Sequence, residues 1–435
     1  MPLSEMIHYR HPNHFIGDVH PFYDTTSHRW FLYYLLPGGT FQSHAAISRD
    51  LIHWEDTPLS FENTPRAPYY VVAVMKHKKV YYSWYGQQFT HVCSVSNDGI
   101  HWRANPSYDI PVNKMASPLG ERDPFITFDK DRNCFYEIAL AYIKSMTDCA
   151  ITFKKTIGSD LNLWEWLTIP LLRFPNTSAW EYGEPECPQL IKIGRRWYLF
   201  ASLAHRTVHH VGGFSYWIGD IDVDPEKVDW DRKQRYVLTS EDLCATQLAW
   251  RNHQLYAMGW IPQNAQGNEW GGHVNSPMRV RSSPEGLLWA EPDPGFWFQW
   301  DLKPIFEIQK PANVAYRLPE GQLFALHATW AGETPTTLTF KNTVVAYDVT
   351  LDPKNQTLSV KDASGYVFAS IPLVEEKNRF DVFMVINRDI LEVSVNRKTV
   401  LHARVSRPIT NDDLIIDAPW IEKLTIATIH PKEEE

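Results

Sequence analysis

Three acidic residues open three similar segments of the chain. Asp18 begins DVHPFYDTTSHRWFLYYL, Asp123 begins DPFITFDKDRNCFYEIALAY, and Glu186 begins ECPQLIKIGRRWYLFASL. Each segment reads as an acid, a proline within one to three residues, a strand-forming stretch, a polar turn and an aromatic strand. If such units surround an axis, equivalent positions converge and the three carboxylates face one another in a central pocket. Converging carboxylates near an arginine are the groups that cleave glycosidic bonds.

Carboxylates held this close cannot all ionise, because mutual repulsion and partial desolvation raise the pKa of at least one of them. The acid with the raised pKa would act as general acid at neutral pH, and an ionised one would attack an anomeric carbon or activate water. The third acid, beside Arg122, is suited to holding sugar hydroxyls. The guanidinium fork would keep that carboxylate ionised and oriented.

Four further residues are expected to bind substrate. They are Arg122, His20, Tyr70 and Cys187. His20 follows Asp18 by two residues, so on a strand both side chains point to the same face. For Cys187 the favoured alternative is packing beneath Glu186, since free cysteines are often buried.

No metal ion or cofactor is expected from the spacing of ligand-type residues. The 18 histidines are dispersed, and the adjacent pair His209-His210 would point to opposite faces of a strand. The predicted chemistry therefore depends on carboxylates alone.

Five hairpin-like units recur at intervals of roughly 50–63 residues. They span residues 18–35, 68–85, 123–142, 186–202 and 243–260. Between them an acid precedes a tryptophan by four residues, at Asp50 and Trp54, Asp98 and Trp102, and Asp160 and Trp164, with Glu226 and Trp230 as a weaker copy. Four strands per unit and five units predict a five-bladed β-propeller. A β/α barrel is disfavoured, because no stretch shows a sustained apolar period of 3.6 residues.

The pattern changes near residues 300–315, after which strands with period-two alternation follow one another with short polar turns. This pattern predicts a C-terminal antiparallel β-sandwich. We expect a propeller domain over residues 1–303, a linker over 304–314 and a sandwich domain over 315–435. The sandwich carries no constellation of acids, so its expected role is structural.

Three motifs resemble those of glycoside hydrolase family 32, the invertase and fructanase family. They are Arg122-Asp123-Pro124, Glu186-Cys187-Pro188 and the more specific string Ser48-Arg49-Asp50-Leu51-Ile52-His53-Trp54-Glu55. The stretch 380–405 also resembles a strand pair of that family's sandwich. The resemblance covers nearly the whole chain and implies retaining hydrolysis or transfer of a β-fructofuranosyl group from a small saccharide. It implies Asp18 as nucleophile, Asp123 as transition-state stabiliser and Glu186 as acid/base.

The chain departs from the family pattern around the sugar. Gly17 stands where the family has an asparagine before the nucleophile, and Leu35 stands at the position of a common glutamine. The usual Phe-Ser-Gly-Ser run is replaced by residues 69–72, and the Trp-Gly pair before residues 43–46 is missing. The acids are thus kept while the polar residues around the sugar are changed, which puts ordinary invertase specificity in question.

Two rival functions stay open from the sequence. One is an inverting arabinofuranosidase or xylosidase of the related family 43, which also uses two aspartates and a glutamate. The other is a catalytically inactive carbohydrate-binding propeller, which retention of all three acids argues against. A scaffold for partners other than carbohydrate is disfavoured, since only the common use of propellers as platforms supports it.

Composition limits the partners and the compartment. The 435-residue chain has a formal net charge of −9, which disfavours nucleic acid and anionic membranes as partners. Five scattered cysteines fit a reducing setting, and no segment has the length of a membrane span. We expect a cytoplasmic glycosidase, or a secreted one if a signal peptide has been removed. The oligomeric state is not evident from the sequence.

Overall fold

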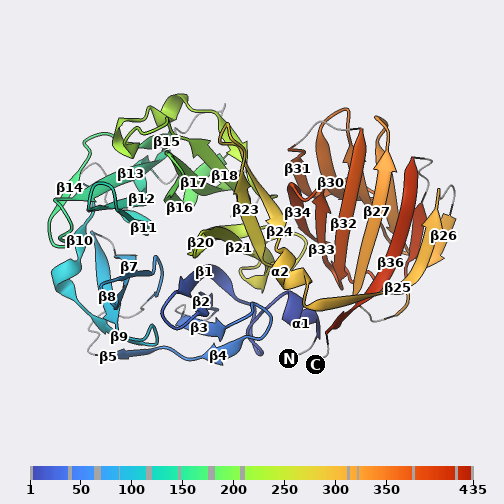
Figure 1. Ribbon diagram of the computed structural model, residues 1–435, viewed down its shortest axis with the longest axis horizontal. Coiled ribbons are helices and arrows are strands. Elements are labelled where there is room, and N and C mark those ends of the chain that lie inside the picture. The colour runs from blue at the N-terminus through green and yellow to red at the C-terminus, as the bar shows by residue number, and fades with distance from the viewer. Residues whose placement is uncertain are drawn as a thin grey trace.

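The computed structural model shows a nearly all-β protein with a propeller on one side and a β-sandwich on the other (Figure 1). The structure describes residues 3–37, 42–62, 70–87, 89–113, 120–145, 148–174, 182–205, 211–310, 314–320, 323–374, 378–416 and 420–432. The predicted fold class, a five-bladed propeller followed by an antiparallel sandwich, is confirmed.

Five sheets form the propeller in the part of the chain that is described. The first two contain β1 (Gly17–Asp24), β2 (Arg29–Leu36), β3 (Gln42–Ser48) and β4 (Glu55–Thr57), then β5 (Ser60–Glu62), β6 (Met75–His77), β7 (Val80–Gln87), β8 (Thr90–Ser96), β9 (His101–Ala104) and β10 (Ile110–Pro111). The third contains β11 (Glu121–Asp129), β12 (Cys134–Ser145), β13 (Asp148–Thr156), β14 (Trp164–Trp166) and β15 (Leu172–Phe174).

The last two sheets of the propeller complete the ring. They contain β16 (Tyr182–Ile193), β17 (Arg196–His205), β18 (Val211–Ile218) and β19 (Arg235–Val237), then β20 (Cys244–Arg251), β21 (Gln254–Pro262), β22 (Gly272–Val274), β23 (Met278–Ser282) and β24 (Leu288–Pro292). Short helices lie at α1 (Leu3–Ile7), α2 (Pro294–Trp297), η1 (Pro106–Tyr108), η2 (Pro225–Lys227) and η3 (Trp230–Arg232). Strand β1 of the first sheet contacts β20 of the fifth, which closes the circle.

The recurring acid-to-tryptophan element forms the turn between the third and fourth strands of a blade. Oδ1 of Asp50 accepts the backbone N–H groups of Ile52 and His53, each at 2.8 Å. The indole N–H of Trp54 then donates to the carbonyl of Leu51 at 3.1 Å. Asp98 and Trp102 make the same bonds, and Trp164 makes the indole bond. The weaker copy differs, because Glu226 and Trp230 lie in the short helices η2 and η3.

The second predicted hairpin, residues 68–85, lies partly outside the described residues. Its described part gives β6 and β7, and β6 is only three residues long. Ala73 precedes β6 with a positive φ of 49°. The innermost strands of the other four blades also have one residue with a positive φ at the corresponding place: Asp18, Asp123, Cys187 and Ala245. The second blade therefore has the same backbone conformation as the others, but with an alanine at this position.

The sandwich consists of two six-stranded sheets. One contains β25 (Trp300–Gln309), β27 (Phe324–Ala331), β32 (Arg379–Asn387), β33 (Ile390–Val395), β34 (Thr399–Arg404) and β36 (Ile421–Pro431). The other contains β26 (Val314–Arg317), β28 (Thr336–Lys341), β29 (Ala346–Asp352), β30 (Thr357–Asp362), β31 (Val367–Pro372) and β35 (Asp413–Ile416). Alternate residues of the facing sheets form one apolar core, as in β29, where Tyr347, Val349 and Leu351 are buried.

Residues 304–309 of the predicted linker belong to β25, which pairs along its length with β36. β25 is an edge strand and most of its residues are exposed, while Phe306 and Ile308 pack against the sandwich core. The predicted domain limits, 1–303 and 315–435, stay predictions.

Candidate active site

Each innermost strand that carries a candidate residue has the same β-bulge. In β1 the pairing with β2 shifts between Gly17 and His20, and in β11 the pairing with β12 shifts between Arg122 and Phe125. Two residues of the inner strand therefore oppose one residue of its partner. Asp18 and Asp123 are the first bulged residues, and both have the left-handed backbone conformation, with φ of 48° and 54°. Such strain at non-glycine residues is concentrated at functional sites.

Glu186 does not occupy the position equivalent to Asp18 and Asp123, contrary to the sequence analysis. The bulge of β16 lies between Glu186 and Gln189, and its left-handed residue is Cys187, with φ of 48°. Glu186 is one residue earlier and aligns with Gly17 and Arg122. The prolines at 124 and 188 follow the left-handed residues directly, so an alignment on these prolines would have given the correct register.

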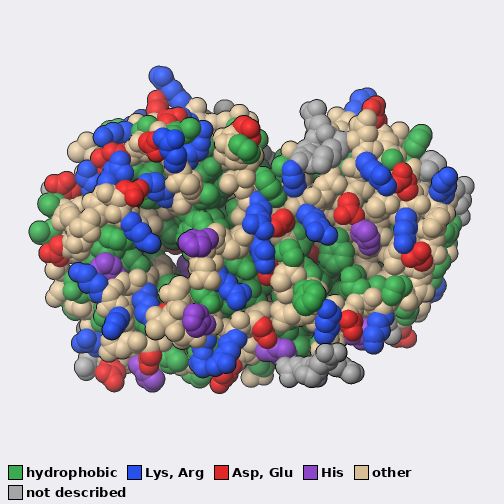
Figure 2. Space-filling view, in the orientation of Figure 1, with side chains coloured by type: hydrophobic (Ala, Val, Ile, Leu, Met, Phe, Trp, Pro, Cys, Tyr) green, Lys and Arg blue, Asp and Glu red, His purple; other side chains and the backbone are tan. Residues whose placement is uncertain are grey.

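The bulges nevertheless bring all three acids to one cavity. This cavity has a volume of about 530 Å³, within the usual range for small-molecule sites. Its lining includes Asp18, Arg122, Asp123, Glu186, Cys187, Cys244, Ala245, Trp260, Gly267, Asn268, Glu269 and Trp270. A second cavity of about 330 Å³ shares Asp18, Arg122, Asp123 and Cys187 with the first. The propeller is visibly hollowed near its centre on the face shown in Figure 2.

Arg122 connects the acids of two blades. Its Nη1 donates to Oδ2 of Asp123 at 2.8 Å, and its Nη2 donates to Oε1 of Glu186 at 2.6 Å. The same Nη2 donates to Oε2 of Glu184 at 2.7 Å, while Nε donates to the hydroxyl of Tyr142 at 2.9 Å. A planar guanidinium fork that is fully engaged in this way fixes the orientation of each carboxylate.

The electrostatics raise the pKa of two of the acids, and one of these is Asp18, the expected nucleophile. Burial, together with the charges of Glu186 and Asp123, raises the pKa of Asp18 to about 7 against the opposing effect of Arg122. Burial also raises the pKa of Glu186, although Arg122 pulls it down. At neutral pH the site therefore holds fewer charges than it has carboxyl groups, which is the condition for a general acid and a nucleophile to coexist.

The predicted substrate-binding residues lie around these acids. His20 and Tyr70 line the smaller cavity, and Cys187 lines both cavities. Burial lowers the pKa of His20 to about 4, so its imidazole is neutral at neutral pH. The ring of Tyr70 packs edge-on against Tyr85, with centroids 5.9 Å apart.

Cys187 holds Asp123 rather than offering a reactive thiol. Its backbone N–H donates to Oδ2 of Asp123 at 3.2 Å. Burial and the surrounding acids raise the pKa of the thiol well above its ordinary value, so it stays protonated. The side chain forms part of the cavity wall, next to Trp260 and Trp270.

Several residues at the site were not predicted from the sequence, among them Glu184, Trp260 and Trp270. Glu184 precedes Glu186 by two residues on the same strand, and this spacing was the available signal that it shares the face of Glu186. Trp260 is the last residue of the predicted hairpin 243–260, and it pairs with Cys244 of the neighbouring strand. Trp270 lies in the loop after β21, where no periodic pattern indicates an inward-facing ring.

Two changes relative to the family pattern are explained by packing. A Cβ atom on Gly17 would lie 2.5 Å from the Trp270 indole, so this ring occupies the space of a side chain at residue 17. Leu35 lines the smaller cavity, where it presents an apolar surface in place of an amide.

Two clusters of potential metal ligands exist among the described residues, and neither lines these cavities. One contains His91, Glu121 and Glu137, with Lys154 bonded to Oε2 of Glu121 at 2.6 Å and 2.7 Å from Oε2 of Glu137. The lysine already supplies the positive charge there. The other cluster contains His11, His44 and Asp56.

The model of the glycosyl hydrolases family 32 N-terminal domain matches residues 8–284, which include every residue that lines the two cavities. The chain belongs to glycosyl hydrolase family 32. The resemblance seen in its motifs is thereby confirmed, and a glycosidase is the class of enzyme that this membership supports. No curated protein matches the chain by sequence.

Solved structures of family 32 enzymes share the fold over almost the entire chain. A β-fructofuranosidase of Bombyx mori superposes with a TM-score of 0.76 at 16% identity, covering 99% of this chain and 96% of its own. A sucrose-6-phosphate hydrolase of Lactobacillus gasseri gives 0.75 at 14%, covering 99% and 94%. An exo-inulinase of Aspergillus awamori gives 0.73 at 16%, covering 98% of each chain. At these identities the likeness establishes the fold alone.

Among the described residues, no helix has both the length and the apolar character needed to cross a membrane.

Proposed function

We propose that this family 32 protein removes or transfers a terminal β-fructofuranosyl group of a small saccharide by a retaining double displacement. The observation that carries the proposal is the meeting of Asp18, Asp123 and Glu186 around Arg122 in one cavity. A family 32 relative, a variant of the Bombyx mori β-fructofuranosidase, has been solved in complex with sucrose, which supports a small saccharide as substrate.

In this mechanism Asp18 attacks the anomeric carbon while Glu186 protonates the departing oxygen. Glu186 then takes a proton from the incoming water or alcohol, whose oxygen attacks the anomeric carbon and breaks its bond to Asp18, so that the configuration is retained. Asp123 accepts hydrogen bonds from Arg122 and from the Cys187 N–H, which orient its carboxyl group toward the position of the sugar hydroxyls.

The positions of the acids suggest how substrate is divided between the cavities. Glu186 lines only the larger cavity, so we place the leaving group there, against Trp260 and Trp270. Asp18 and Asp123 line both cavities, and the furanosyl ring would contact them at the boundary. The two indoles offer apolar faces of the kind on which sugar rings stack.

The changed residues around the sugar favour a substrate other than free sucrose. Leu35 and Val72 add apolar surface to the smaller cavity, while His20 and Tyr70 supply its new polar groups. A pocket built to hydrogen-bond particular hydroxyls rejects sugars that lack them, because its buried polar groups are then left unpaired. We therefore expect activity on short fructo-oligosaccharides, difructose anhydrides or aryl fructofuranosides in preference to sucrose.

The test is a panel of these sugars together with the variants Asp18→Asn and Glu186→Gln. Either change should lower turnover at least 100-fold on the best substrate. Unchanged rates in both variants would refute the assignment. Proton NMR of the first-formed product separates the mechanisms, since retention gives the β anomer and the rival inverting enzyme gives the opposite one. Sugar binding by calorimetry without turnover of any substrate would instead indicate an inactive binding propeller.

A further inference from the structure

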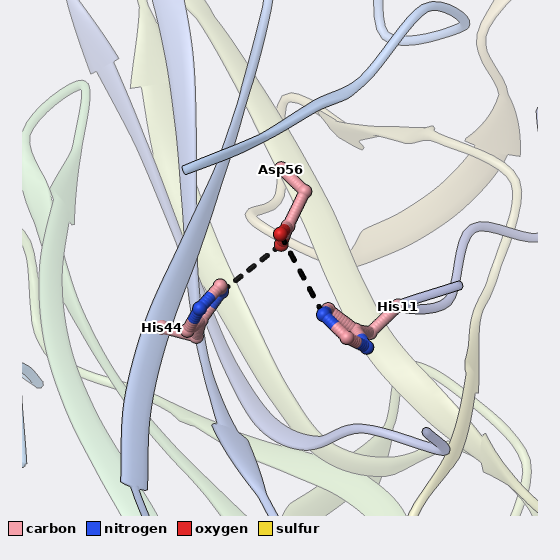
Figure 3. Close-up of side chains that lie close together, drawn as sticks. All are labelled: His11, His44 and Asp56. Carbon is pink, nitrogen blue, oxygen red and sulfur yellow. Dashed lines mark ion pairs between the residues drawn. The ribbon is translucent and has the colours of Figure 1, made fainter. Parts of the chain in front are cut away.

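Two histidines and an aspartate meet on the outer part of the first blade, away from the two cavities (Figure 3). His11 lies in the segment between α1 and β1, His44 lies on β3, and Asp56 lies on β4. The three residues are far apart in sequence, so their spacing resembles no short ligand motif and the sequence analysis expected no metal. Folding of the outer strands against the N-terminal segment brings them together.

The potential donor atoms of the three side chains converge. Nδ1 of His44 lies 3.0 Å from Oδ1 of Asp56, and Nε2 of His11 lies 3.5 Å from Oδ2 of the same carboxylate. One donor atom from each residue lies within 4.8 Å of the other two. The histidine side chains are only 11% and 15% exposed, and Asp56 is 30% exposed, so the cluster is shielded but still reachable from solvent.

A second layer of residues orients these donors. The hydroxyl of Tyr34 donates to Oδ1 of Asp56 at 2.7 Å and lies 3.2 Å from Nδ1 of His44. The hydroxyl of Tyr9 lies 3.5 Å from that of Tyr34 and continues the chain of polar groups. Metal-binding carboxylates are commonly held by such outer hydrogen bonds, which fix the ligand before the ion arrives.

The composition of the cluster differs from the other histidine–aspartate contacts of the described chain. His53 with Asp50, His101 with Asp98, and His327 with Asp381 each join one imidazole to one carboxylate. Such a pair is an ordinary surface interaction of small energy. Two imidazoles on one carboxylate give three donors of two chemical types, which is the minimum that a transition-metal ion requires from a protein.

We propose that His11, His44 and Asp56 bind one divalent transition-metal ion, with Zn²⁺ as the preferred ion and water completing the coordination. Imidazole nitrogen and carboxylate oxygen are ligands that Zn²⁺ prefers, whereas Ca²⁺ and Mg²⁺ prefer oxygen ligands alone. Zinc bonds to nitrogen and oxygen measure about 2.0–2.2 Å, so two ligand atoms of a tetrahedral zinc ion lie roughly 3.3–3.6 Å apart. The separations of 3.0 Å and 3.5 Å between the imidazole nitrogens and the Asp56 carboxylate are close to this spacing.

Binding also requires each imidazole to move the proton on the nitrogen that faces Asp56, as His11 illustrates. Nδ1 of His11 accepts the backbone N–H of Asn13 at 3.2 Å, which leaves the proton on Nε2, the nitrogen that faces Asp56. When Nε2 takes the ion, the proton belongs on Nδ1 and the Asn13 bond is given up. Asn13 is exposed, so its N–H can bond to water instead.

The ion would fasten the segment that leads to Asp18. This segment is joined to the fifth blade by the bond from the Val274 N–H to the Tyr9 carbonyl and by the bridge between Ile16 and Gly272. An ion bound by His11, by His44 on β3 and by Asp56 on β4 would also connect this segment to the outer strands of the first blade. The expected consequence is a more stable propeller rather than a new reaction, since the cluster lies outside both cavities.

The test uses the full-length protein freed of metal with a chelator and titrated with ZnCl₂ by calorimetry and by thermal unfolding. We expect one equivalent to bind with a Kd on the order of 1 µM or below, and Tm to rise by several degrees at saturation. His11→Gln, His44→Gln and Asp56→Asn should each weaken binding at least 10-fold. His53→Gln, which alters a surface pair of the same chemistry, should bind Zn²⁺ like the wild type.

Co²⁺ provides a second readout that does not depend on the stability of the variants. Its visible absorption should show bands of nitrogen and oxygen coordination in the wild type, and these should disappear in His11→Gln, whose folding is checked by circular dichroism. The proposal is overturned if the wild type binds no Zn²⁺ at 100 µM. It is also overturned if folded His11→Gln and His44→Gln keep the affinity of the wild type, which would place the ion elsewhere.

Discussion

The indole of Trp270 fills the space beside the backbone of Gly17. A Cβ atom built on Gly17 would lie 2.5 Å from Cζ2 of this ring and 2.8 Å from Cε2. Gly17 directly precedes Asp18 and stands where the family pattern has an asparagine. A side chain at residue 17 and the Trp270 indole in its present position therefore exclude each other.

Restoring the side chain at residue 17 should displace this ring. We expect Gly17→Asn to lower stability by about 1–3 kcal/mol, because side chains forced into filled space strain their surroundings. Urea unfolding measures the loss. In a Trp270→Ala background the same substitution should cost much less, since the space is then free. Equal losses in the two backgrounds would mean that the indole is not what excludes a side chain.

Replacing Asp18 by Asn should inactivate the enzyme and stabilise the fold. The pKa of Asp18 lies near 7 in the folded protein, above the ordinary aspartate value, so the charged form is disfavoured by folding. Its contribution to stability is fully present below the unfolded pKa, near 4, and is lost as pH rises through about 7. Asp18→Asn should therefore raise Tm at pH 8, by an amount equivalent to roughly 1–3 kcal/mol, and change it little at pH 4.

Asp50 is the matched control for this prediction. Burial acts to raise its pKa, but hydrogen bonds from His53 and Ile52 outweigh burial and lower it. Asp50→Asn should thus destabilise the protein at neutral pH, opposite to Asp18→Asn. A fall in Tm for both variants at pH 8 would contradict the assignment of a raised pKa to Asp18.

Glu184 should influence the proton affinity of Glu186. Its negative charge contributes to the raised pKa of Glu186, after the larger effects of burial, Arg122 and Asp123. Removing the charge in Glu184→Gln should lower the pKa of Glu186. The protonated general acid is then lost at a lower pH, so the alkaline limb of the kcat/KM profile should move to lower pH.

Tyr142→Phe serves as the comparison for Glu184→Gln. It removes the 2.9 Å bond to Nε of Arg122 without changing the charge of the site. We expect a reduced rate with the alkaline limb in its original place. If both variants shift the profile equally, the effect of Glu184 is on the position of Arg122 and not on the proton affinity of Glu186.

Lys154 should be essential to the third blade. It is fully buried between Glu121 and Glu137, whose side chains are also fully buried. Lys154→Met removes the ammonium group that both carboxylates share and should cost about 3–5 kcal/mol. Since Glu121 adjoins Arg122, activity should fall as well. The neighbouring Lys155 pairs with Glu226 at the surface, so Lys155→Met should cost less than about 1 kcal/mol in the same urea titration.

Much of the fold could be predicted because its strands carry local signals. The aromatic hairpins and the acid-to-tryptophan turns recur at nearly regular spacing, and the bonds of Asp50 and Trp54 show why this turn requires both residues. The sandwich strands alternate because one face packs on the core. Residues 304–309 of the predicted linker instead form part of the edge strand β25, most of whose residues are exposed.

By itself the sequence identified four residues that meet in one cavity, because Asp18, Asp123, Glu186 and Arg122 each stand in a short motif. Only the tertiary structure decided how they meet. The β-bulge sets Glu186 one residue before the position of the aspartates, and a bulge leaves no periodic trace in the sequence.

The contributions of distant loops were also decided by folding alone. Trp270 reaches Gly17 from another blade, and His11 reaches Asp56 from the N-terminal segment. Such contacts depend on the closure of the ring of blades, which places residues side by side that no local pattern relates.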